Sequence, residues 1–508
     1  MAPKKVKTSS GDSISTLPDE VLGQILSLLP TKLAASTTIL TKRWRNLFPL
    51  VHNLDFDPFI VTGRSSYLDF MEKTLVLLRD SPIKKFSLKW SSLKCVNHII
   101  YSVLENGVLE LHLSSSVCQC LLPEFFSRTL VKLTLSNGCY YQTKLPPGGV
   151  LFPSLKTLSL SLVCFPENAP VDLYECLLAS PLLEEFNICD DHPHRAGWVK
   201  QVSGSSIRRM SIFYRSHNIK DHSCFVIKTP NLVYLDYSSY VAEDYVVQFD
   251  SLVEARLDLR LWKYYDFVPP KALYYGYDPS TDGPWGDATK LIAALRNVVT
   301  LHLSADSLEV FYSCSELMLE FNNLVTLSFE SHKERSWQVL PLLVKNSPNL
   351  ETLVIKGLVH KITDECGNVC VHKKIKTKKR CCLLSCRVKM LKIYGYGGRW
   401  REMQQMRHFI ENLKCLEVVK VKIYELPPID YGLQVHFCGY GSQKKMETAS
   451  GDYISALPKL LLPILSLLPT KIAASTSVLS KQWRNLFPLV HNLTFDKSMV
   501  PCSVFDDE

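Results

Sequence analysis

Ser347-Pro348-Asn349-Leu350 leads into an apolar stretch in which Leu353 and Ile355 alternate with other residues. Alternation with a period of two is typical of a β-strand, and the proline marks the turn that precedes it. The same phrase recurs as Ser180-Pro181-Leu182-Leu183 and as Thr229-Pro230-Asn231-Leu232. The recurrence predicts that one structural unit is repeated along the chain.

Alternating apolar pairs extend this pattern in both directions, and most successive pairs are about 22 to 28 residues apart. That period is typical of leucine-rich solenoids, in which each repeat buries its apolar side against its neighbours. The pairs are Phe86/Leu88, Leu111/Leu113, Leu133/Leu135, Leu158/Leu160, Phe186/Ile188, Met210/Ile212, Leu235/Tyr237, Leu257/Leu259, Leu301/Leu303, Leu327/Phe329, Leu353/Ile355, Leu391/Ile393 and Val419/Val421.

Helical segments are expected between the strands, for example over Tyr67–Arg79, Asn97–Glu105 and Ala288–Leu295. One strand and one helix per repeat predict an α/β fold with a parallel sheet on a concave face. Two steps are long. One follows Leu259 and the other, with the basic run Lys373–Arg380, follows Ile355. Such insertions are often binding loops, and loosely packed excursions from the array are the alternative.

The insertion after Leu259 is rich in aromatic residues, which dominate the hot spots of protein interfaces. We therefore interpret four of them as a candidate contact with a protein target. Core packing of an irregular repeat is the alternative. The four are Trp262, Tyr264, Tyr265 and Tyr275.

A small helical unit precedes the array, over Asp12–Asp57. Ser15 or Thr16 can cap a first helix, Thr31 a second and Thr41 a third, Lys42–Phe48. The first helix is apolar on more than one side, which indicates that another protein completes it.

The end of the chain repeats this unit. Ser466–Asp496 matches Ser27–Asp57 with 25 identities in 31 positions. The copy has Lys459 where the first helix begins and Pro463 inside that helix. A cation at the positive end of the helix dipole and an interior proline both destabilise a helix. We expect this copy to bind a partner weakly or not at all.

The composition fits a folded protein, with 46% hydrophobic residues, 21% charged residues and a net charge of +9. This modest charge does not call for a nucleic-acid partner. The 17 cysteines are scattered and odd in number, and neither a secretory signal nor a membrane-spanning run is recognised. Free thiols in a cytoplasmic and/or nuclear location are expected.

The first unit resembles the F-box, through Leu17-Pro18-Asp19-Glu20-Val21-Leu22 and Leu40-Thr41-Lys42-Arg43-Trp44-Arg45-Asn46-Leu47. The whole chain is similar to plant F-box/leucine-rich-repeat proteins that end in an FBD segment. Phe409-Ile410-Glu411-Asn412 carries the FBD likeness. The expected fold is α/β: a three-helix F-box, a leucine-rich-repeat solenoid with a parallel sheet, an FBD-like end and a C-terminal F-box-like helical segment.

The resemblance implies a non-catalytic adaptor of a Skp–cullin–F-box ubiquitin ligase, which binds a Skp-type adaptor, through it a cullin, and an unknown protein target. The adaptor contacts it implies are Leu17, Pro18, Val21, Ile25, Leu26, Leu29 and Pro30. The expected core of the F-box is Trp44, Leu40 and Leu47, with an adaptor contact as the alternative for Trp44. The chain departs from its relatives at Leu33-Ala34, where an acidic residue is common.

The expected organisation is a basic tail (1–11), the F-box (12–57), the repeat array (58–380), the FBD-like segment (381–424), a linker (425–450), the second copy (451–496) and a tail (497–508).

Other readings of the chain stay open. A small-molecule-dependent receptor and a non-productive product of tandem fusion are alternative functions, and Pro3-Lys4-Lys5-Val6-Lys7 is either a nuclear import signal or a solvated tail. Cys366, Cys370, His372, Cys381, Cys382 and Cys386 lack the paired spacing of a zinc knuckle, so no metal is expected. No motif of nucleotide binding, metalloprotease or hydrolase chemistry is found, so neither a cofactor nor an enzymatic activity is expected.

Overall fold

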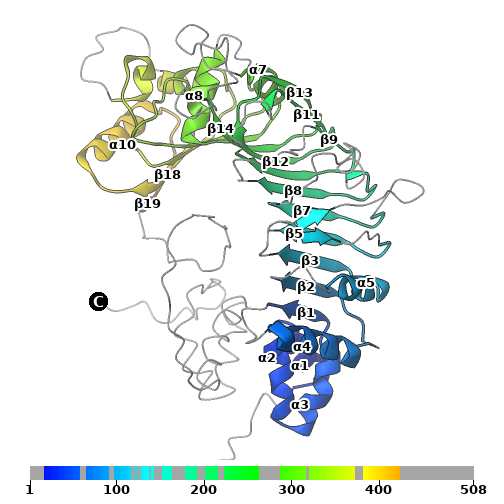
Figure 1. Cartoon of the computed structure of the whole chain (residues 1–508). Coiled ribbons are helices and arrows are strands. Elements are labelled where there is room, and N and C mark those ends of the chain that lie inside the picture. Colours follow the sequence, from blue (N-terminus) through cyan, green and yellow to red (C-terminus); the bar gives the residue numbers. More distant parts are fainter. Residues whose placement is uncertain are drawn as a thin grey trace, which may run out of the picture. The chain divides into compact units, whose positions relative to one another are not determined.

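The computed structural model describes residues 17–57, 64–79, 81–90, 96–115, 120–122, 127–136, 139–141, 152–162, 178–190, 201–215, 222–262, 286–315, 320–371 and 382–423. They fall into two compact units that divide between Leu54 and Asp55. The first holds the helices at the start of the chain, and the second holds the strands that follow (Figure 1).

The first unit contains the three predicted helices, α1 (Asp19–Leu26), α2 (Thr31–Ser36) and α3 (Lys42–Leu47). The short turns η2 (Thr37–Ile39) and η3 (Phe48–Leu50) follow α2 and α3. Thr41 caps α3 as predicted, because its hydroxyl accepts a hydrogen bond from the Trp44 amide at 3.4 Å.

The predicted caps of the other two helices were wrong. Pro18 precedes α1 and Pro30 precedes α2, neither with a side-chain cap. The fixed φ of proline suits the start of a helix, and Asp19 and Glu20 add negative charge to the first turn of α1. Proline and charge therefore start α1 without a hydroxyl cap.

The strands form one main sheet of 14 strands, and every strand pair with a described register is parallel. Its strands, in spatial order, are β1 (Asn53–Phe56), β2 (Lys85–Trp90), β3 (Glu110–Ser115), β5 (Lys132–Ser136), β7 (Thr157–Ser161), β8 (Glu185–Asp190), β10 (Arg209–Tyr214), β12 (Tyr234–Tyr240), β14 (Glu254–Arg260), β15 (Thr300–Leu303), β16 (Thr326–Glu330), β17 (Thr352–Lys356), β18 (Met390–Tyr396) and β19 (Val418–Ile423). The order follows the chain, as expected for a solenoid.

Helices and two small sheets accompany the main sheet. The helices are α4 (Arg64–Leu77), α5 (Asn97–Glu105), α7 (Thr289–Ala294), α8 (Ala305–Ser313), α9 (Leu340–Lys345) and α10 (Trp400–Asn412), with η8 (Asp364–Val369) and η9 (Cys382–Leu384). The small sheets are β9 (Gln201–Ser203), β11 (Cys224–Lys228) and β13 (Asp244–Gln248), and β4 (Cys120–Leu122) with β6 (Cys139–Tyr141). Figure 1 shows α5, α7 and β11 on the same side of the main sheet.

Each predicted apolar pair lies in a strand of the main sheet, with one error of register. The pair of β14 that aligns with Leu235 and Tyr237 of β12 is Ala255 and Leu257, not Leu257 and Leu259. The neighbouring strand confirms this, because Leu301 and Leu303 pair with the same two residues. Leu259 is also buried, so β14 carries an apolar side three residues long.

Strand residues alternate between buried and half-buried along most of the main sheet. The buried side carries the leucines, each of which stabilises the fold by about 1.5 to 3 kcal/mol when fully removed from water. We call the opposite side the open face. It is defined by the half-buried or exposed positions of β2 to β19, such as Ser159, Arg256 and Lys356.

No helix in the described part of the chain has the length and apolar character needed to cross a membrane.

Candidate functional site

The predicted adaptor-binding residues on and beside α1 differ in accessibility. Pro18 and Val21 are exposed, Val21 at 38%. Leu17, Ile25, Leu29 and Pro30 are half-buried. Leu26 is only 1% exposed, so it packs inside the helical unit. The accessible part of the predicted set is therefore the start of α1 and the turn that follows it.

The core of this unit is only partly the predicted one. Leu47 is buried as expected, at 1% exposure, and Trp44 is half-buried. Leu40 was predicted to be a core residue, and this is wrong because its side chain is 62% exposed. Leu22, Leu26, Ala34, Phe48 and Val51 fill the core with Leu47.

Several large apolar side chains of the same unit face solvent. Leu28, Ile39 and Leu40 are 57%, 81% and 62% exposed, in addition to Val21. Exposed apolar groups on so small a unit are typical of a surface that another protein covers. Sequence reasoning missed Leu28 and Ile39, although the all-round apolar pattern was the signal.

Arg43 fixes the start of α1 against α3. Its Nη2 donates to the carbonyl oxygen of Leu17 at 2.6 Å and to Asp19 Oδ1 at 2.6 Å, and its Nε donates to the same carboxylate at 2.9 Å. Both charged side chains are more than one-third exposed, so screening limits the energy. The bidentate contact sets the orientation of Leu17 and Pro18.

The open face changes in character along the array. From β7 to β10 it carries Ser159, Ser161, Asn187 and Ser211, which line a cavity of about 260 Å³. From β12 to β17 it carries charged side chains, which line a second cavity of about 500 Å³. These two cavities make the open face the candidate site for a target.

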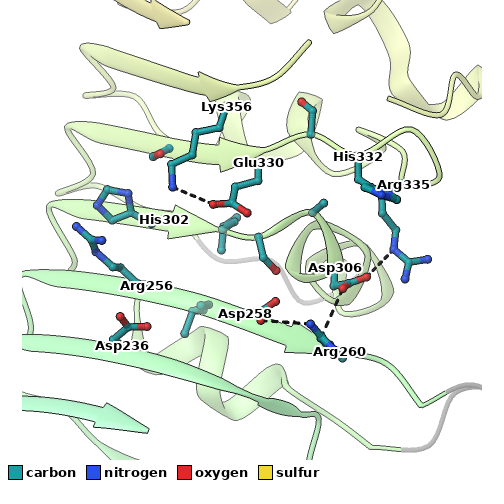
Figure 2. A pocket seen from close by; sticks show the side chains of 16 residues that line it. Asp236, Arg256, Asp258, Arg260, His302, Asp306, Glu330, His332, Arg335 and Lys356 are labelled. Atoms are coloured by element: carbon teal, nitrogen blue, oxygen red, sulfur yellow. Dashed lines mark hydrogen bonds and ion pairs between the residues drawn. The ribbon is translucent and has the colours of Figure 1, made fainter. Parts of the chain in front are cut away.

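The larger cavity, which we call the charged cavity, is lined by alternating acids and bases (Figure 2). Arg335 Nε donates to Asp306 Oδ1 at 2.5 Å, and Lys356 Nζ donates to Glu330 Oε1 at 2.9 Å. Arg260 stands between Asp258 and Asp306, at 3.7 Å from each carboxylate. Strand register brings Arg256 and His302 side by side on neighbouring strands.

The charges of the cavity shift the pKa values of its titratable groups. Burial raises the pKa of Asp236 above its usual value, although Arg256 opposes the shift. Burial and the charges of Arg256 and Lys356 lower the pKa of His302, whereas the carboxylate of Glu254 raises it. These shifts favour the neutral form of the His302 ring.

Of the four predicted target contacts, the structure describes only Trp262. Trp262 is 5% exposed, its Nε1 donates to the Val241 carbonyl at 2.8 Å, and its ring stacks on Tyr240 at 4.4 Å. The target-contact interpretation of Trp262 is wrong, and the alternative, core packing, is confirmed. Tyr264, Tyr265 and Tyr275 lie outside the described residues.

Cys366 and Cys370 are both buried, and His360 Nε2 lies 3.1 Å from Cys370 Sγ. Hydrogen bonding from Cys370 lowers the pKa of Cys366 below its usual value, and the same contact raises the pKa of Cys370. His372 and Cys381 lie outside the described residues. Within the ranges that the structure describes, no three His, Cys, Asp or Glu side chains are grouped to hold a metal ion.

The structure thus combines a solenoid built on a parallel sheet with a small helical unit that exposes apolar side chains. The F-box domain model matches residues 14–54 and again 454–493. The second match confirms the C-terminal copy, which lies outside the described residues.

Relatives in Arabidopsis thaliana match most of the chain. F-box protein At1g21990 is 50% identical over 430 residues, which is 81% of this chain and 90% of the relative. F-box/LRR-repeat protein At1g48400 is 45% identical over 465 residues, which is 82% of this chain and 93% of the relative. The chain belongs to the F-box/LRR-repeat family. The FBD interpretation of residues 381–424 and the other domain boundaries stay predictions.

Proposed function

We propose that this protein is a substrate-recognition subunit of a Skp–cullin–F-box ubiquitin ligase, in the cytoplasm or nucleus, and that it performs no chemistry itself. The F-box match at residues 14–54, in a unit with exposed Val21, Leu28, Ile39 and Leu40, carries the proposal. A Skp-type adaptor covers these side chains and connects the chain to a cullin.

The open face of the array holds the target in this proposal. Holding a target near a ubiquitin-charged enzyme raises the effective concentration of its lysines, and this requires no catalytic residue in the chain. The cavities lined by Ser159 and Arg256 provide polar contacts at two places along the sheet. Target selection then depends on hydroxyl and charged groups together.

Co-purification of the full chain with a Skp-type adaptor tests the proposal, and the repeated sequence supplies a matched control. Leu17→Ala with Pro18→Ala removes an exposed and a half-buried group at the start of α1. Leu457→Ala with Pro458→Ala makes the same change in the C-terminal copy. We expect the first double variant to lose the adaptor and the second to retain it.

Undiminished capture by the first double variant would contradict the proposed docking site. Capture lost only in the second would assign docking to the C-terminal copy, and so overturn the expectation that this copy binds weakly. Circular dichroism on each variant separates lost docking from lost folding.

A small-molecule-dependent receptor is a second candidate, and the charged cavity is the observation that favours it. Its volume of about 500 Å³ lies within the usual range of small-molecule sites. Native mass spectrometry of the purified complex would show added mass for a retained ligand. Arg256→Gln, at an exposed residue of the cavity wall, should remove that mass.

A further inference from the structure

Three of the four carboxylates that line the charged cavity, Asp258, Asp306 and Glu330, are already paired with cations in or beside it. Asp258 accepts a hydrogen bond from Arg215 Nη2 at 2.9 Å, and Asp306 and Glu330 are paired as described above. A cationic ligand would have to displace one of these cations. The displaced charge would be left without its partner in a partly buried place, which is unfavourable.

Hydrogen-bond donors, in contrast, remain available in the same cavity. Both contacts of Arg260, at 3.7 Å, are too long for hydrogen bonds, and its buried Nε has no hydrogen-bond partner in the described structure. Arg256 donates its Nε to Glu254 at 3.1 Å. A guanidinium carries five N–H donors and an ammonium three, so Arg256 and Lys356 have donors beyond their recorded bonds.

The remaining donors lie on two sides of the cavity (Figure 2). His302 lies next to Arg256 in register, and Lys356 lies on β17, across β16 from β15. Figure 2 shows Arg256, His302 and Lys356 along one side of the cavity, with Arg260 on the other. Burial lowers the pKa of His302, and the positive charges of Arg256 and Lys356 act in the same direction.

The same wall continues as a basic surface toward the last strands. Lys392 of β18 and Lys420 of β19 occupy the row of the open face that contains Arg256 and His302, and Lys422 lies two residues further along β19. An acidic segment placed in the cavity would therefore meet further cations in one direction along the sheet. Complementary charge of this kind guides a partner and fixes its orientation.

We propose that the charged cavity binds a carboxylate or phosphate group of a protein ligand, held by Arg256, Arg260 and Lys356. This inference deepens the proposed function and rests on it for one point only, that the protein ligand is the ubiquitination target. Acidic or phosphorylated segments are then the substrate class. Charge-assisted hydrogen bonds from guanidinium groups supply both the affinity and the selection.

Three capped pentapeptides, Gly-Gly-Glu-Gly-Gly, its glutamine analogue and its phosphoserine analogue, are titrated into the full chain by calorimetry. We expect the glutamate or the phosphoserine peptide to bind, and the glutamine peptide to bind at least about ten-fold more weakly. The tighter of the two anions identifies the group. Equal binding of the glutamine peptide would overturn the proposal.

Arg256→Gln with Lys356→Gln should weaken binding of the anionic peptide by about ten-fold or more. Both residues are exposed, so the fold should survive. The matched control, Lys85→Gln with Lys132→Gln, removes two cations from the other end of the open face and should leave binding within about two-fold. An equal loss in the control would show attraction by the net charge alone and would reject the site.

Capture of the Skp-type adaptor by the Arg256→Gln, Lys356→Gln variant separates the two proposals. If the unsubstituted chain captures the adaptor but binds no anionic peptide, the adaptor role is supported and the anion site is rejected. Anion binding without adaptor capture does the reverse.

Discussion

Asp258 of β14 contacts polar groups from three neighbouring parts of the open face, namely Arg215 directly after β10, Ser238 of β12 and Arg260 of β14 itself. Its carboxylate accepts hydrogen bonds from Arg215 at 2.9 Å and from Ser238 of β12 at 3.0 Å. Burial alone would raise the pKa of Asp258. Four neighbours outweigh burial and place the pKa of Asp258 below its usual 3.8. Ser304 and Ser238 act by hydrogen bonding, and Arg260 and Arg215 act by their positive charge. The ionised form is thus stabilised by folding.

The depressed pKa of Asp258 predicts a pH-dependent contribution to stability. The contribution is fully present above the unfolded value of 3.8 and is lost as the pH falls through the lower folded pKa. Asp258→Asn should reduce the free energy of unfolding by about 1 to 3 kcal/mol at pH 7, because it weakens charge-assisted hydrogen bonds. Denaturant titrations of the original chain and of the Asp258→Asn variant at pH 7 and pH 3 measure this loss in the free energy of unfolding.

The difference between variant and original chain should shrink at pH 3. A difference that stays constant between the two pH values would show that Asp258 acts through packing and not through its charge.

Trp262 and Leu40 show why single residues are hard to place from sequence. An aromatic residue at the start of an insertion can face either a partner or the core. The apolar alternation of the strands ends at that point, so the sequence pattern does not choose between the two. The structure decides the matter through a neighbour far along the chain, the Val241 carbonyl. Leu40 fits the helical spacing of a core position, but α2 ends at Ser36 and the chain continues as the 3₁₀ turn η2, which does not keep the α-helical spacing. Its side chain consequently faces solvent.

At the scale of elements, the strands of the main sheet could be predicted because each repeats one apolar pattern. The register of β14 could not, because Ala255, Leu257 and Leu259 offer two pairs with the same spacing. Pairing with Tyr237 of β12 and Leu303 of β15 selects the first pair. The strands β9, β11 and β13 were not predicted, since short strands in a second layer carry no repeated phrase.

The turn that leads into α7 depends on Gly286. Its φ of +97° is one that L side chains rarely adopt, and an added Cβ would lie 2.9 Å from the Val241 carbonyl oxygen. Gly286→Ala should therefore combine backbone strain with a clash and destabilise the protein by about 1 to 3 kcal/mol. Thermal unfolding measures the loss.

Gly398 is the control for this prediction. Its φ is +70°, but nothing lies within 4 Å of a Cβ added there. Gly398→Ala should cost only the backbone strain, about 1 kcal/mol. Equal melting temperatures for the two variants would show that the turn before α7 relaxes around the new methyl group.

At the scale of the whole array, each strand is stabilised mainly by packing against its two neighbours. The strand order follows the chain from β1 to β19, and β19 has a described sheet neighbour on one side only. Val419 and Val421 of β19 are 39% and 40% exposed, whereas Leu391 and Ile393 beside them on β18 are fully buried. In such an array, a substitution that weakens the packing of one strand mainly destabilises the adjacent strands.

Leu301→Ala tests this distribution of stability. Leu301 is fully buried and lies between Ala255 of β14 and Leu327 of β16. Its truncation should cost about 2 to 5 kcal/mol locally. Hydrogen exchange should therefore accelerate in β14, β15 and β16, with β2 and β3 unchanged. Thr300→Ala, one residue away on the open face, is the control and should alter exchange little. Uniform acceleration through β2 would mean that the array opens as one cooperative unit, and the nearest-neighbour description would then fail.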